Sequence, residues 1–137
     1  MGMNILLPDQ RCHGKSGGRF TTFGVKESRD MLAWIDYHNQ HFGSYPMLLS
    51  GLSMGAATVL MAAGHPLPPN VIGILADCGY SSARDIMADV MKKMGVPSGL
   101  GYPFVKLGAR LFGGFDPDET SPVEAVKRCK VPVIFYH

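Results

Sequence analysis

One stretch decides the fold of this chain: residues 47–55 read MLLSGLSMG. An apolar run of strand length leads directly into a Gly-x-Ser-x-Gly pentapeptide, and an apolar, helix-like segment at residues 56–63 follows at once. This context predicts a sharp strand–turn–helix that lifts Ser53 above the end of a sheet. We expect Gly51 and Gly55 to leave room where the two backbones nearly touch, because a Cβ at either place would clash.

A serine in such a turn is a candidate nucleophile. The turn would expose the Ser53 hydroxyl, and the backbone N–H of Met54, at the start of the helix, would point to the place where an oxyanion forms. The alternative is a glycine-rich strand–helix turn with a chemically idle serine. The flanking strand and helix favour the nucleophile.

Composition limits the classes of protein that remain. The chain of 137 residues is long enough for one domain with a real core, and 46% hydrophobic with 18% charged residues describes a globular protein. A net charge of +2 with scattered basic residues speaks against nucleic-acid binding. The three cysteines form no Cys-x-x-Cys pair, so we expect neither a disulfide framework nor a zinc site, and reduced thiols in the cytoplasm. Histidine, aspartate and glutamate do not recur at the spacing of metal ligands, so we expect no metal, and we expect no cofactor. No apolar run approaches the roughly 20 residues of a membrane helix.

Strand-like and helix-like segments alternate along the chain. Unalternating apolar runs, which are typical of strands buried on both faces, predict four parallel strands at residues 3–7, 47–51, 71–76 and 131–136. Helical patterns predict helices at residues 25–42, 56–63 and 122–128, the last beginning with the capping box Ser-Pro-Val-Glu. The fold class is therefore α/β, with a doubly wound, mostly parallel sheet.

The helix at residues 25–42 is predicted to be amphipathic. Its inner face would carry Met31, Leu32, Ile35 and Phe42, and Lys26, Glu27, Arg29 and Asp30 would lie largely on the opposite, solvated side.

Residues 80–115 depart from this alternation. A Ser-x-x-Asp cap at Ser82 opens one helix, and a bend rich in glycine and proline leads to a second apolar stretch at residues 104–112. We expect a small helical, cap-like insertion above the strand ends, next to a substrate pocket. Ordinary core packing is the alternative role for its methionines and aromatic residues.

The chain resembles the middle of an α/β hydrolase and is most similar to the bacterial group of small esterases, lysophospholipases and serine aminopeptidases. Three motifs carry the resemblance: PDQRCHGKSGG at residues 8–18, the turn at residues 51–55, and KVPVIFYH at residues 130–137. The resemblance implies that the catalytic acid follows His137 and that the catalytic histidine comes one strand later. It also places three strands before residue 1, one of which would fill a slot between residues 3–7 and 47–51. We therefore expect residues 1–137 to be roughly half of a longer hydrolase domain.

The five histidines of the chain are expected to be structural or exposed rather than catalytic. They are His13, His38, His41, His65 and His137. Asp77 follows a strand at a point where some α/β hydrolases carry their acid, so it is a second candidate for the acid, although a base would still be missing.

The sequence therefore predicts a serine hydrolase that cleaves small to medium acyl esters through an acyl-enzyme on Ser53. Met54 would supply an oxyanion N–H, and Leu52 and Met54 would line the substrate pocket. A serine peptidase or thioesterase of the same fold and a non-catalytic scaffold are the alternatives. The expected partner is a small ester or acyl substrate, with possible self-association through open sheet edges as a further expectation.

Overall fold

Three parallel strands form the centre of the computed structural model, which describes residues 2–137. The strands are β1 (Met47–Leu52), β2 (Val71–Asp77) and β3 (Val133–Tyr136), in the spatial order β1-β2-β3. They end in register, since Leu52 pairs with Asp77 and Asp77 with Tyr136. Their carboxyl ends therefore meet at one edge of the sheet, where parallel α/β folds place their functional groups.

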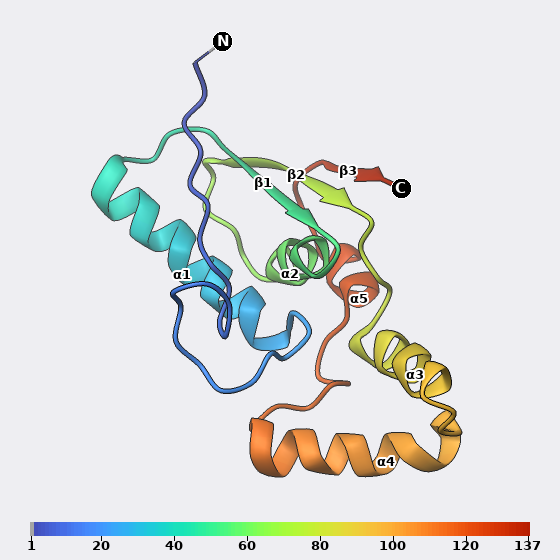
Figure 1. The fold of residues 1–137 in the computed structure, drawn as a ribbon. Coiled ribbons are helices and arrows are strands. Elements are labelled where there is room, and N and C mark those ends of the chain that lie inside the picture. The colour runs from blue at the N-terminus through green and yellow to red at the C-terminus, as the bar shows by residue number, and fades with distance from the viewer. Residues whose placement is uncertain (1) are drawn as a thin grey trace.

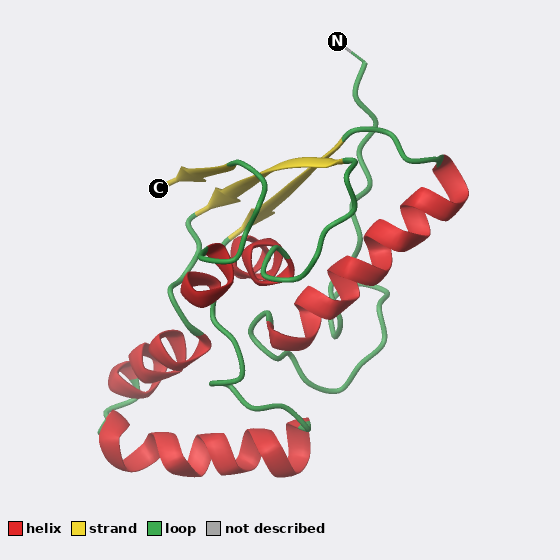
Figure 2. Cartoon of the chain, turned by 180° about the vertical axis from the view of Figure 1, so that it is seen from behind, coloured by secondary structure: helices red, strands yellow, loops and turns green. Residues whose placement is uncertain are grey.

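Helices lie between and beyond these strands. They are α1 (Val25–Phe42), α2 (Met54–Ala62), α3 (Ala83–Lys93), α4 (Ser98–Gly108), a π-helical turn η1 (Ala109–Gly113) and α5 (Pro122–Val126). In Figures 1 and 2, α1, α2 and α5 lie together on one face of the sheet. The predicted α/β class and parallel sheet are confirmed, with three strands in place of four.

The core lies between the sheet and this helical layer. Helix α2 is apolar on all sides, and most of it is buried between β1, β2, α1 and α5. Ile35 of α1, Leu49 of β1 and Ile74 of β2 are almost completely buried in one cluster with it. Burial of one such side chain stabilises the fold by about 1.5–3 kcal/mol. The helix that follows Ser53 is thus the centre of the core.

The other face of the sheet is uncovered. Because side chains alternate along a strand, one set points away from α2, and most apolar side chains on this side are well exposed. They are Leu48, Leu52, Ile72, Ile134 and Tyr136. The described chain therefore has helices on one face of the sheet, whereas a doubly wound sheet has them on both.

Residues 3–7 do not form the predicted fourth strand. They run as an irregular segment, and Met3, Ile5 and Leu7 are each more than 80% exposed. A strand needs a neighbour for its backbone N–H and C=O groups, and no strand of the described chain pairs with this segment. Residues 3–7 have the apolar composition of a strand, but a strand also needs a partner strand for its backbone hydrogen bonds.

Helix α1 has the predicted bounds, but two of its side chains were assigned to the wrong side. Phe42, expected in the core, is exposed at the last turn. Glu27, expected in solvent, is 1% exposed and accepts hydrogen bonds from the Thr22 amide (2.8 Å), the Thr22 hydroxyl (2.5 Å) and the Gly24 amide (2.9 Å). These three bonds satisfy a carboxylate that would otherwise be costly to bury.

The segment after β2 forms the predicted helices. The Ser82 hydroxyl caps α3 by accepting the Asp85 N–H at 3.0 Å. Helix α4 begins at Ser98, before the apolar stretch that suggested it, because Pro97 and the glycines nearby allow the chain to turn into it. Two carboxylates behind it, Asp116 and Asp118, bind its polar side: Lys106 donates to Asp118 at 2.6 Å.

The last unit follows its prediction with small differences. The Ser121 hydroxyl accepts the Glu124 N–H at 3.2 Å, which is one half of the capping box. The Glu124 carboxylate binds Lys127 instead of returning to the Ser121 amide. The strand begins at Val133, two residues later than predicted.

Candidate active site

Ser53 occupies a tight turn between β1 and α2. Its backbone has φ 53° and ψ −110°, a conformation that residues other than glycine rarely adopt. The residue is exposed. Two backbone hydrogen bonds hold it: the Ser53 N–H donates to the Asp77 carbonyl at 2.8 Å, and the Ser53 carbonyl accepts from the Ala57 N–H at 3.1 Å. The strand–turn–helix predicted from the pentapeptide is present, with the serine at its apex.

The two glycines of the pentapeptide have different surroundings. A Cβ on Gly51 would lie 2.2 Å from the backbone carbon and oxygen of Gly55 and 2.6 Å from the Ala56 nitrogen. Glycine is therefore required at position 51, as predicted. A Cβ on Gly55 would meet nothing within 4 Å among the described residues, so the predicted clash at this position is wrong. The close approach is one-sided: Gly51 meets the backbone of the helix.

Met54 is the first residue of α2, directly after Ser53. The first N–H groups of a helix have no acceptor within it and carry its positive partial charge. The oxyanion of a tetrahedral intermediate attached to the Ser53 oxygen would lie close to this helix end. The Met54 N–H is therefore a candidate oxyanion donor.

Asp77 ends β2 in the rung beside Leu52, one strand away from the turn. Its Oδ1 atom is buried without a hydrogen-bond partner among the described residues. The next residue, Cys78, has φ 50°, and its side-chain hydrogen bond with Asp77 raises the pKa of the exposed thiol. Asp77 thus lies near the candidate nucleophile and holds a neighbouring thiol in its protonated form.

No histidine among residues 2–137 forms a hydrogen bond with Ser53. The imidazoles of His13 and His41 contact the carbonyls of Arg11 and Tyr37, both at 2.9 Å. His38 is half-buried, with Nδ1 unpartnered in the described chain, and is tilted against Phe42. His65 lies in the turn after α2.

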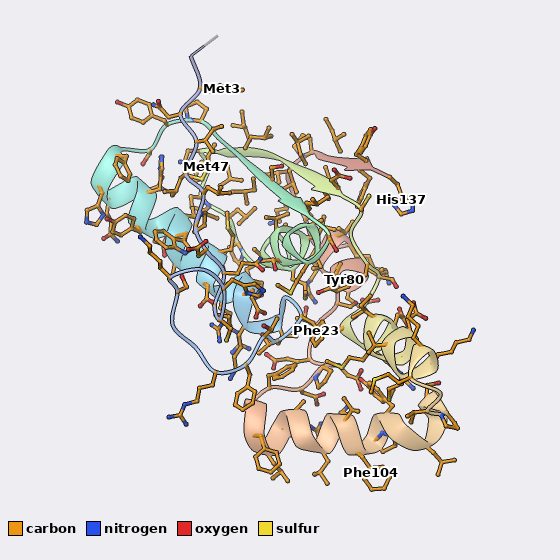
Figure 3. The ribbon with its side chains drawn as sticks, viewed as in Figure 1. Met3, Phe23, Met47, Tyr80, Phe104 and His137 are labelled. Carbon is orange, nitrogen blue, oxygen red and sulfur yellow. The ribbon has the colours of Figure 1, made fainter. Side chains whose placement is uncertain are left out.

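His137 follows β3 at the same edge of the sheet as Ser53. The Cys78 N–H donates to the Tyr136 carbonyl at 2.9 Å, so the end of β2 separates His137 from the turn. Two strand spacings amount to roughly 10 Å between backbones. Figure 3 shows His137 at the free end of the chain. Ser53, Met54 and Asp77 therefore lie at the carboxyl edge of the sheet. Within the described residues, no histidine is hydrogen-bonded to Ser53 to act as its base.

A polar contact that the sequence analysis did not identify ties the loop at residues 8–18 to α2. The Gln10 amide donates to the Thr58 hydroxyl at 3.1 Å, and this hydroxyl donates to the Met54 carbonyl at 2.8 Å. The contact therefore reaches the first turn of the helix behind Ser53. Its sequence signal is a threonine four residues after Met54, because helical threonines often bond to that carbonyl.

The same loop is fixed to α1 by an ion pair. The Arg11 guanidinium donates two hydrogen bonds to Asp30, at 2.6 and 2.7 Å. This contact raises the pKa of Arg11, so the arginine stays charged. Within the loop, the Asp9 carboxylate accepts the Lys15 N–H at 3.0 Å. The motif at residues 8–18 is thus an ordered loop packed beside the turn.

Two cavities of the described chain lie away from the turn. One of about 140 Å³ lies near Val25, Arg29 and Glu119, and one of about 360 Å³ lies near Pro66, Leu67 and Lys130. Leu52, assigned to the substrate pocket, is well exposed on the uncovered face of the sheet. The pocket predicted around Leu52 and Met54 therefore has no counterpart in these two cavities.

No group of three or more histidine, cysteine, aspartate or glutamate side chains within residues 2–137 is placed to hold a metal ion. None of the helices in this range is long and apolar enough to cross a membrane.

Comparisons with known proteins agree with an α/β fold that is similar to the fold of an esterase. No family model matches the chain. It is 30% identical over 141 residues to YqkD, an uncharacterized protein of Bacillus subtilis, across all of this chain and 46% of that protein. It is similar to the solved structure of the Pyrococcus furiosus esterase PF2001, with a TM-score of 0.64 and 28% identity over 93% of this chain and 47% of the esterase. The chain thus spans just under half the length of each, and an esterase shares the arrangement of its helices and strands.

Proposed function

We propose that this chain carries the nucleophile of a serine hydrolase that cleaves carboxylic esters of small to medium acyl groups. The observation behind the proposal is the conformation of Ser53: an exposed serine with a positive φ, between a parallel strand and the start of a buried helix. The likeness to an esterase supports the same chemistry. Strained backbone at an exposed nucleophilic side chain is typical of functional sites.

The proposed reaction proceeds through an acyl-enzyme. The Ser53 Oγ attacks the ester carbonyl while a base takes its proton, and the Met54 N–H helps to hold the oxyanion of the tetrahedral intermediate. The bond to the leaving alcohol then breaks and the alcohol receives the proton. Water attacks the acyl-enzyme in the same way and releases the acid and the free serine.

The base and its acid are proposed to come from sequence outside residues 1–137. This proposal is supported by the lack of a histidine contact to Ser53 in the described chain and by the partial coverage of both relatives. A serine without a base is a poor nucleophile. We therefore expect the isolated 137-residue chain to hydrolyse p-nitrophenyl acetate no faster than buffer does. Hydrolysis that Ser53→Ala abolishes would show that the chain contains its own base.

The proposal is tested on the protein isolated from its native source with a fluorophosphonate probe. We expect labelling in the unmodified protein and none in Ser53→Ala. Ser50→Ala is the matched control, since Ser50 is exposed on β1, the strand that leads into the turn, and labelling should be unchanged. A protein that stays unlabelled would favour the non-catalytic scaffold.

A substrate series separates the remaining alternatives within the serine hydrolases. The series contains p-nitrophenyl esters of increasing acyl length, a thioester and an aminoacyl p-nitroanilide. The proposal predicts the highest kcat/KM on an ester. A preference for the anilide would identify a peptidase, and a preference for the thioester would identify a thioesterase.

A further inference from the structure

The first turn of α2, directly after Ser53, has no side-chain cap. A serine at the N-cap of a helix commonly accepts a hydrogen bond from an N–H of the first turn. The Ser53 hydroxyl makes no such bond, and the first turn contains no acidic residue. The N–H groups at this helix end therefore keep their positive partial charge, and the hydroxyl stays available for reaction. Other contacts have to hold the turn in place.

A chain of two hydrogen bonds reaches this turn from the loop at residues 8–18. The Gln10 amide donates to the Thr58 hydroxyl at 3.1 Å, and this hydroxyl donates to the Met54 carbonyl at 2.8 Å. We call Gln10, Thr58 and the Met54 carbonyl the Gln10 relay. A hydroxyl has one proton to donate. Because the Thr58 oxygen accepts from Gln10, its own proton is directed to Met54.

Both ends of the Gln10 relay are anchored. The Gln10 carbonyl accepts the His13 N–H at 3.0 Å, which closes the loop on this residue. The guanidinium of the next residue, Arg11, donates two hydrogen bonds to Asp30 of α1. The Thr58 side chain lies in the core and is 3% exposed, so its hydroxyl is shielded from water. A short relay between two anchored segments restricts the movement of the carbonyl at its end.

We propose that Gln10 and Thr58 are positioning residues for the reaction at Ser53. They hold the Met54 carbonyl, and with it the N–H on the other side of the same Cα, in the direction that an oxyanion at Ser53 requires. This inference rests on the proposed hydrolase function, because it gives the Gln10 relay a role in that reaction. A purely structural contact is the alternative, and it would stabilise the fold without affecting the reaction rate.

The test measures kcat and KM of the native protein on whichever ester, thioester or anilide it cleaves fastest. Gln10→Met is the first variant, because methionine has nearly the length of glutamine and no N–H to donate. We expect kcat to fall about tenfold and KM to stay within about twofold, since substrate still binds but the oxyanion meets a displaced N–H. Gln40→Met is the matched control: Gln40 is exposed on α1, and both constants should be unchanged.

Thr58→Ser and Thr58→Val form a second matched pair. Serine keeps the hydroxyl, so kcat should stay within about twofold, whereas valine has the shape of threonine without the hydroxyl and should lower kcat about tenfold. Gln10→Met added to Thr58→Val should cause little further loss, because Gln10 acts through Thr58. Circular dichroism verifies that each variant is folded. If Gln10→Met or Thr58→Val is not, alanine at the same position replaces it.

Three outcomes would overturn the inference. A normal kcat in Gln10→Met, even with a lower melting temperature, would make the contact purely structural. Equal losses in Thr58→Ser and Thr58→Val would assign the effect to packing of the threonine methyl group instead of the hydrogen bond. Both outcomes leave the proposed hydrolase function intact. A native protein that cleaves none of the substrates and is not labelled by the fluorophosphonate would overturn that function together with the inference.

Discussion

At the scale of single residues, Ser53 combines exposure with an unfavourable backbone. A non-glycine residue at φ 53° and ψ −110° costs on the order of 1–3 kcal/mol, and the hydrogen bonds to Asp77 and Ala57 hold it there. The turn places the hydroxyl beside the start of α2 at the expense of stability. A chemical role for the Ser53 hydroxyl would explain why the protein keeps this backbone strain.

Ser53→Gly should therefore stabilise the chain. Glycine adopts a positive φ without a steric penalty, so we expect the free energy of unfolding of Ser53→Gly to exceed that of Ser53→Ala by about 1 kcal/mol. Both variants lack the hydroxyl, so fluorophosphonate labelling should be absent in both. Urea denaturation measures the difference, and equal stabilities would mean that the turn is not strained.

The two glycines of the pentapeptide form a second matched pair. Gly51→Ala should destabilise the chain by about 3 kcal/mol, because its Cβ would overlap the backbone of Gly55 and Ala56. Gly55→Ala, in open space at the start of α2, should change stability by less than about 1 kcal/mol and favour the folded state. Denaturation curves for both variants provide the test. A larger loss for Gly55→Ala would contradict the structure.

The pentapeptide predicted the conformation at Ser53 and the need for Gly51, because both depend on a few neighbouring residues. Contacts between residues that lie apart in the sequence could not be predicted in this way. Glu27 was assigned to solvent as a charged residue, and the Thr22 groups that satisfy it are recognisable only once the chain turn before α1 is known. The contact from Gln10 to Thr58 joins residues 48 positions apart.

At the scale of elements, carboxylates hold α4 and η1 in place. Asp116 accepts a hydrogen bond from Arg110 and forms an ion pair with Lys106 at 3.2 Å. The contact with Arg110, the largest contribution, lowers the pKa of Asp116 to about 2. An unfolded aspartate has a pKa near 4, so the folded state favours the ionised carboxylate.

This shift predicts acid sensitivity. The stabilisation is fully present above about pH 4, the pKa of the unfolded aspartate, and is lost as the pH falls toward about 2, where the folded carboxyl also protonates. The melting temperature should fall over this window, and less so in Asp116→Asn. Asp36→Asn, at an exposed position of α1, is the control and should leave the profile unchanged. Added salt should reduce the effect, because the Arg110 side chain is more than half exposed.

Elements with strong internal signals were predicted well, and elements that need a partner were not. The periodicity and glycine boundaries of α1 predicted its bounds, and the apolar run at residues 71–76 predicted β2 to within one residue. The segment at residues 3–7 has the composition of a strand, yet a strand is a property of a pair. Helix α4 began six residues before its predicted apolar stretch, since glycine- and proline-containing helices give weak signals.

At the scale of the whole molecule, the sheet has a core on one face and solvent on the other. Leu48, Ile72 and Ile134 form part of an exposed apolar surface, and the outer edges of β1 and β3 are unpaired in the described chain. Such surfaces favour association. We expect the isolated 137-residue chain to self-associate as its concentration rises.

Charged substitutions test this expectation. Leu48→Lys combined with Ile134→Lys should shift light scattering toward the monomer, because a cation on that face opposes burial. Phe42→Lys, at an equally apolar and exposed position on α1, should leave the assembly unchanged. A monomeric unmodified chain at all concentrations would contradict the prediction. The same face also explains why the sequence shows buried-strand character: its strands are apolar on both sides, including the side without a covering layer.

The backbone amide of Ser53 donates to a carbonyl of the neighbouring strand, whereas the hydroxyl of the same residue is exposed and has no hydrogen-bond partner among residues 2–137. Deuterium uptake at this amide consequently reports on the separation of β1 from β2, and motion of the turn alone does not expose it. Although its side chain is exposed, Ser53 should thus exchange its amide proton among the slowest of the described residues. An incoming molecule would therefore meet a hydroxyl whose backbone is already held in position by hydrogen bonds.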